Sequence, residues 1–210
     1  MALMKPRIAI AASTGLLLIA GRIADLATTF HFTPNLRREA NPLVHNLGMG
    51  WNGLLATNLC LTLLVLAGLY YYGTRSSREV EWSPSEGAWG FAGRALYGQA
   101  LSPGRLILRL LTCWPLPRNW KQTLRLLGLS CGWMVVFSSF TAAFGWWANH
   151  AWKLAWWMRL NRSLHIGVYP LMGILIGLLG GALAVVVFFV TEYREATARP
   201  GEKTGAPAGE

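Results

Sequence analysis

The stretch IAIAASTGLLLIAGRIADLATTF, residues 8–30, decides the fold of this chain. It is an apolar run long enough to cross the roughly 30 Å hydrocarbon core of a bilayer as a helix. It nevertheless carries Arg22 and Asp25 in its second half. Charged side chains at this depth cost free energy unless they are paired or hydrated, so we expect both to face the interior of a helix bundle. The stretch therefore predicts a first membrane span with a polar site near its outer end.

Three further apolar runs, at about residues 51–72, 124–147 and 166–190, predict that the chain crosses the membrane four times. Hydrophobic residues make up 53% of the chain and charged residues only 13%, well below the roughly 25% usual in soluble domains. No β-strand pattern competes with these runs. We therefore expect an all-α integral membrane protein with a single four-helix domain over residues 1–191. A disordered cytoplasmic tail is expected over residues 192–210.

The distribution of positive charge predicts the orientation of the spans. Eight Lys and Arg residues lie in or just after the long loop of residues 73–123, against five on the opposite side of the membrane. Cytoplasmic loops are enriched in Lys and Arg, so we expect this loop and both termini in the cytoplasm. The expected location is the cytoplasmic (inner) membrane of a bacterium or archaeon.

The long loop also has a pattern of its own. A helix from Ser102-Pro103 to about Cys113 has an apolar face, while Arg105 and Arg109 share its polar side. This pattern is typical of a helix that lies on the inner membrane surface. The formal net charge of +10 is therefore explained by lipid headgroups and topology. No nucleic-acid-binding module is recognisable, and we expect no nucleic-acid partner.

Residues that can perform chemistry gather at the outer end of the first span and in the loop after it. Asp25 and Glu39 are the candidate catalytic residues, since two carboxylates can act as acid and base, hold a cation or relay protons. The alternative is structural, because Arg22 and Asp25 lie three residues apart on one helix face and can form an ion pair that fixes packing. The remaining candidates for this polar site are Thr28, Thr29, His31, Asn41 and Pro42.

The pattern Asp25-x-x-Thr28-Thr29 followed by Glu39-x-Asn41-Pro42 resembles the D-x-x-[ST]-T…E-x-N-P pattern of an uncharacterised family of small four-helix bacterial and archaeal membrane proteins. The resemblance covers about the first two spans. It implies that these residues act together, and it implies no particular activity.

Two further sets of residues predict contacts between helices or at the membrane surface. Glycines at four-residue spacing in the fourth span predict a smooth face for close helix packing. A dense tryptophan cluster in the outer segment of residues 146–165 predicts an interfacial belt. The same aromatic rings would also suit a stacked quinone, haem or carotenoid, or a partner protein, so the cofactor is left open. The glycines are Gly173, Gly177 and Gly181, and the tryptophans are Trp146, Trp147, Trp152, Trp156 and Trp157.

Other catalytic and metal motifs are weak. Residues 128–132 spell G-x-S-x-G, but this hydrolase pattern needs a strand-turn-helix context and here lies inside a predicted span. We interpret it as a chance match. Cys60, Cys113 and Cys131 are scattered and without CxxC spacing, so no metal site is predicted.

Three functions fit the sequence. The first is a non-enzymatic accessory or assembly subunit of a larger membrane complex, contacting membrane-protein partners through the glycine face and the outer tryptophans. The second is a membrane-embedded enzyme for a lipid-linked substrate that uses Asp25 and Glu39. The third is a small transporter in which Asp25 carries a proton or cation. The sequence has few polar residues in the third and fourth spans to line a pathway, which places the transporter last.

Overall fold

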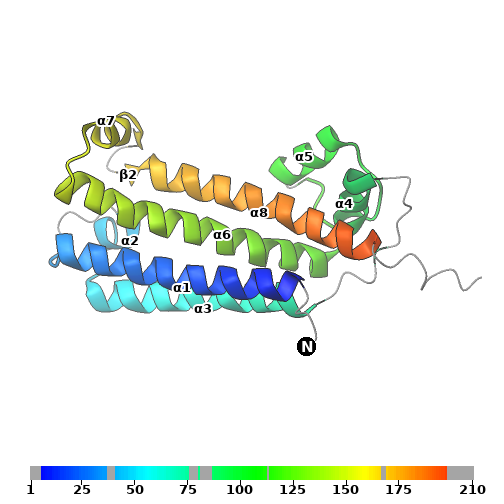
Figure 1. Ribbon diagram of the computed structural model, residues 1–210, viewed down its shortest axis with the longest axis horizontal. Helices are drawn as coiled ribbons and strands as arrows, with labels where there is room; N and C mark the ends of the chain where they lie inside the picture. The colour runs from blue at the N-terminus through cyan, green and yellow to red at the C-terminus, as the bar shows by residue number, and fades with distance from the viewer. Residues whose placement is uncertain are drawn as a thin grey trace, which may run out of the picture.

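The computed structural model describes residues 6–36, 41–75, 80, 87–112, 114–166 and 169–197. Four long helices lie side by side along the longest axis of the molecule (Figure 1). Apart from two short paired strands, the regular structure of the described residues is helical, and the predicted all-α fold is confirmed. The long helices are α1 (Pro6–Phe32), α3 (Trp51–Thr74), α6 (Trp120–Trp146) and α8 (Leu171–Thr197). The short elements are α2 (Pro42–His45), α4 (Gly87–Tyr97), α5 (Pro103–Thr112), the π-helix η2 (Trp147–Ala151), α7 (Ala155–Ser163), β1 (His165–Ile166) and β2 (Tyr169–Pro170).

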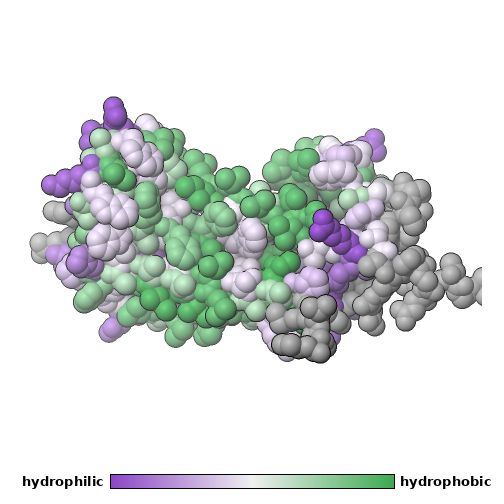
Figure 2. All heavy atoms as spheres, viewed as in Figure 1, coloured by the Kyte–Doolittle hydropathy of each residue, from purple (hydrophilic) through white to green (hydrophobic). Residues whose placement is uncertain are grey.

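All four long helices are long and apolar enough to cross a membrane, the third as α6 continued by η2. Large apolar side chains are exposed along them, for example Leu64 on α3 and Leu179 on α8. Figure 2 shows hydrophobic surface over the middle of the bundle and hydrophilic residues toward its two ends. The chain is therefore a multi-pass membrane protein whose apolar flank suits contact with lipid.

Helix α6 is the centre of the bundle, because it packs against α1, α3 and α8. It comes close to α3 where Gly128 faces Gly68 backbone to backbone. A Cβ added at Gly68 would lie 2.9 Å from the Cα of Gly128, closer than real Cβ contacts allow. One helical turn later, a Cβ at Gly132 would lie 2.9 Å from Leu69. The two glycines of the G-x-S-x-G pattern are thus needed for helix packing, as in other small-residue membrane interfaces.

Helix α8 continues to Thr197, beyond the boundary expected from hydropathy. Residues 192–197 are therefore helical, and the prediction of a tail starting at residue 192 was wrong for these six. The physical reason is burial, since Glu192 is only 1% exposed and pairs with an arginine of α6. Residues 198–210, the rest of the expected tail, lie outside the described residues.

The two helices of the long loop differ in how they meet the bundle. Most of α4 is buried, and its Phe91 ring lies 6.0 Å from the ring of Tyr193 on α8. Helix α5 buries mainly Leu106 and exposes Leu108 and Leu111. The expected amphipathic helix from Ser102-Pro103 is thus present as α5, whereas α4 is part of the packed core.

The Trp-rich segment at the other end is not one continuous helix. Trp152 and Lys153 precede α7, and Lys153 has a φ of 48°, which a regular helix does not allow. The chain turns at this point, so α7 begins only at Ala155 and lies beside the start of α8 (Figure 1).

Candidate functional site

The predicted ion pair in the first span is present. Arg22 Nη1 donates to Asp25 Oδ2 at 3.1 Å, and the same nitrogen donates to Ser139 Oγ of α6 at 3.1 Å. Both charged side chains are 20% exposed. The contact with Asp25 lies within α1 and neutralises Arg22, whereas the hydrogen bond to Ser139 joins α1 to α6. The hydrogen bond to Ser139 holds the two helices in register, and the charge of Asp25 is balanced by Arg22.

The two threonines predicted to act with Asp25 are buried beside it. The Thr28 hydroxyl donates to the backbone carbonyls of Ala24 and Asp25, at 2.8 Å and 2.9 Å. The backbone carbonyl of Thr29 accepts from the N–H of Thr33 as α1 ends. Thr28 is thus bonded to its own helix, as is common for threonine inside membrane helices.

The loop half of the predicted site is described only in part. Glu39, the second candidate carboxylate, lies outside the described residues. The Asn41 carbonyl accepts from the N–H groups of Val44 and His45 and so starts α2, in which Pro42 is the first residue. This is the usual position for a proline at a helix start.

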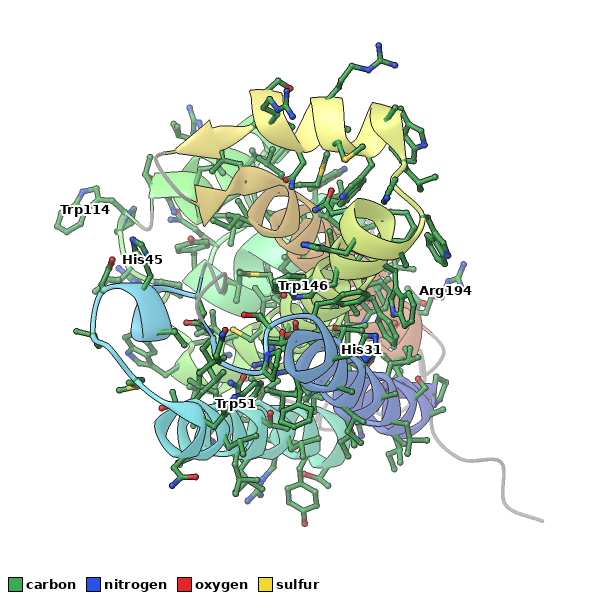
Figure 3. The ribbon with its side chains drawn as sticks, turned by 90° about the vertical axis from the view of Figure 1, so that its left-hand side faces the viewer. His31, His45, Trp51, Trp114, Trp146 and Arg194 are labelled. Atoms are coloured by element: carbon green, nitrogen blue, oxygen red, sulfur yellow. The ribbon has the colours of Figure 1, made fainter. Side chains whose placement is uncertain are left out.

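His31 belongs to an aromatic cluster at the end of the bundle shown in Figure 3. Its ring stacks on Trp147 with centroids 5.8 Å apart, while Phe32 stacks on Trp146 at 6.0 Å. His150 follows on the π-helical segment, with its ring 5.1 Å from Trp146. In the same view His45 lies at the edge of the molecule, away from His31. His31 and His45 are therefore not brought together.

Four of the five predicted interface tryptophans remain partly or largely exposed, and Trp152 and Trp156 are the most exposed, at 56% and 55%. Trp157 is the exception at 6%, because its ring packs edge-on against Phe144 at 4.9 Å. Trp157 therefore packs inside the chain, whereas the other four tryptophans of the predicted interface have exposed surface.

The predicted glycine face of α8 meets α6 of the same chain. A Cβ at Gly177 would lie 3.2 Å from the carbonyl oxygen of Met134, and a Cβ at Gly181 would lie 3.0 Å from the Met134 side chain. Gly173 has open space around it. Two of the three glycines are thus occupied within the chain and are not free to contact a partner.

A second polar cluster, which sequence reasoning missed, lies at the opposite end of the bundle. Arg125 of α6 and Glu192 of α8 are each 1% exposed and form a two-point ion pair, with Arg125 Nη1 3.0 Å from Glu192 Oε2. Arg125 Nη1 also donates to Gln122 Oε1 at 2.6 Å. The guanidinium lies beside two aromatic rings, 5.7 Å from the centroid of Tyr72 and 5.6 Å from that of Phe188. Three spans therefore meet around one buried cation.

A neighbouring pair joins the remaining span. Arg7, near the start of α1, lies 3.4 Å from Glu195 near the end of α8, and the Arg7 side chain is 5% exposed. One sequence feature indicates both ion pairs: two acidic residues, Glu192 and Glu195, follow the fourth apolar run and are one helical turn apart. Acidic residues near a span end that also contains buried arginines indicate interhelical pairing.

The described residues offer little for metal chemistry. They contain no group of three or more His, Cys, Asp or Glu side chains placed to hold a metal ion. No family model, no curated protein and no solved structure matches the chain. The resemblance based on Asp25, Thr28, Thr29, Glu39, Asn41 and Pro42 therefore stays a prediction.

Proposed function

We propose that this protein is a non-enzymatic accessory or assembly subunit, and that one transmembrane helix of a partner protein packs along α8. The observation that carries the proposal is a recess on the α8 side of the bundle. Helices α7 and α5 rise at opposite ends of that side, and the surface between them is hollowed (Figures 1 and 2).

The floor of the recess is apolar. Helix α8 turns Leu175, Leu179 and Val186 away from α6, and these side chains are 47%, 66% and 56% exposed. Ala182 lies among them and is also exposed, so a second helix can approach closely there. The recess is bounded at one end by α7, which carries the exposed Trp156, a residue type enriched at protein interfaces.

The polar groups of the spans support a structural role. Asp25 is paired with Arg22, and Glu192 with Arg125, so these charges already serve contacts inside the chain. An enzyme or a proton carrier needs a carboxylate that meets substrate or water, and in the described spans the carboxylates are engaged in ion pairs. This favours the subunit over the membrane-embedded enzyme and the transporter.

The orientation that we propose places the α4–α5 end in the cytoplasm. Arg75, Arg94, Arg105, Arg109 and Arg118 lie at this end, as expected for the cytoplasmic side of a bacterial or archaeal inner membrane. Both termini then lie on the same side.

The test is site-specific photocrosslinking in the native membrane. A photoreactive phenylalanine analogue replaces Leu179 in the recess or, as the matched control, Leu64, which is 69% exposed on α3 across the bundle. We expect a single defined protein adduct from position 179 and only lipid adducts from position 64. The adduct partner should copurify stoichiometrically in mild detergent, and L179W should weaken that copurification while L64W leaves it intact.

The proposal fails if position 179 gives the same adducts as position 64, or if the protein purifies alone and monodisperse. In that case Asp25 and Glu39 become the residues to test, starting with analysis of the purified protein for bound metal and lipid.

A further inference from the structure

A hollow of about 430 Å³ lies on one side of α5 at the α4–α5 end of the bundle. Its lining combines two guanidinium groups with apolar side chains. Four of its residues come from one face of α5, and the fifth follows the end of the helix. The lining residues are Arg105, Leu108, Arg109, Thr112 and Trp114.

Arg109 is held in position before any ligand arrives. Its guanidinium carbon lies 5.3 Å above the ring of Tyr97, which is itself buried in α4. The Arg109 Nη1 atom is buried and finds no hydrogen-bond acceptor among the described residues. A guanidinium that is already ordered, is partly removed from water and lacks a hydrogen-bond acceptor binds an anion favourably. Arg105, one helical turn earlier and exposed, adds a second guanidinium to the same face.

The apolar part of the lining indicates what accompanies the anion. Leu108 is 61% exposed and Trp114 is 77% exposed. The Thr112 hydroxyl lies 3.4 Å from the backbone nitrogen of Trp114, which keeps this tryptophan next to the helix. Ile107 and Leu111 are exposed on the same helix. An amphipathic helix with these side chains lies at the depth of lipid headgroups, where tryptophan is also enriched.

We propose that this hollow binds the phosphate group of one anionic phospholipid. Arg105 and Arg109 donate to the phosphate oxygens, since guanidinium groups match phosphate geometry. Leu108 and Trp114 contact the glycerol and the first methylene groups of the acyl chains. Inorganic phosphate has the same charge chemistry and would gain nothing from these two apolar side chains, so a lipid fits the lining better. The proposal needs only that the chain lies in a membrane, and it does not rest on the partner proposed for α8.

The experiment measures lipid retention by native mass spectrometry on the full-length protein in detergent. The probes are phosphatidylglycerol and phosphatidylcholine with identical acyl chains. The variant is the double substitution R105Q and R109Q. The matched control is R159Q and R162Q on α7, which removes two exposed arginines from the short amphipathic helix at the other end.

We expect one tightly held phosphatidylglycerol, bound about tenfold more weakly by R105Q and R109Q and unchanged by R159Q and R162Q. The single variant W114A, at an exposed position, keeps both charges and should also weaken lipid binding. It supplies the readout if the double variant fails to fold. Equal retention of phosphatidylcholine, or an equal loss in the α7 control, would overturn the proposal. So would displacement of the lipid by equimolar inorganic phosphate, since that result would identify a simple phosphate site.

Discussion

Replacing Glu192 with glutamine tests whether the pair between α6 and α8 is the main polar contact of the bundle. Glu192 and Arg125 are each 1% exposed, so E192Q leaves a buried guanidinium whose charge has lost its partner. Breaking a buried pair on one side costs about 3–5 kcal/mol, a shift of roughly a thousandfold in the unfolding equilibrium. We therefore expect E192Q to unfold at much lower denaturant than the parent protein.

The assay is titration with sodium dodecyl sulfate in mixed micelles, followed by tryptophan fluorescence. E195Q is the matched control, because Glu195 is 27% exposed and lies 3.4 Å from Arg7. It should cost clearly less than E192Q, because this pair makes one 3.4 Å contact and its carboxylate is partly exposed to water. Replacing Arg125 and Glu192 together with methionine should restore most of the stability, since neither charge is then left alone. A loss for E192Q as small as that for E195Q would refute the reasoning.

Three further perturbations follow from the packing. G128A places a Cβ against a backbone carbonyl of α3 and should destabilise the bundle by about 1–3 kcal/mol in the same titration. The control is G173A, whose added Cβ would lie in open space, so it should be neutral or slightly stabilising. D25N keeps a side-chain oxygen that accepts from Arg22, and both side chains of the pair are 20% exposed. It should therefore lower the free energy of unfolding by only about 1 kcal/mol. A loss beyond about 3 kcal/mol would contradict a partly solvated pair. Cys60 and Cys131 are exposed on spans. In the variant C113S, a charged maleimide should label neither Cys60 nor Cys131 in sealed vesicles, and it should label both cysteines after denaturation. Rapid labelling of either cysteine in vesicles would contradict its contact with lipid.

The membrane spans could be predicted because hydropathy is a local property that adds up along a helix. Their packing could not be predicted in the same way. The regular spacing of Gly173, Gly177 and Gly181 indicated one close contact. The backbone-to-backbone contact between Gly68 and Gly128 was not predicted, because the importance of these two glycines depends on how α3 and α6 are placed against each other.

The polar site was predictable where its members are neighbours in sequence. Arg22 and Asp25 are three residues apart, so their pairing follows from helix geometry. Ser139, the third member, is 117 residues away from Arg22 and gave no signal. Glu192 was assigned to a tail because its local sequence turns polar, and only the buried arginine on α6 explains why the helix continues through it.

The pair between Arg125 and Glu192 also sets an order of events during synthesis. The two residues are 67 positions apart, and at about 5–20 residues per second the ribosome adds Glu192 roughly 3–13 seconds after Arg125. During that interval Arg125 has no carboxylate from α8 to pair with, and a helix with an unpaired arginine inserts poorly into the membrane. We therefore expect the third span to reach its final depth only when the fourth one follows. A chain that stops before residue 192 keeps an unpaired charge near the membrane, a feature by which quality-control proteases can distinguish it from a finished protein.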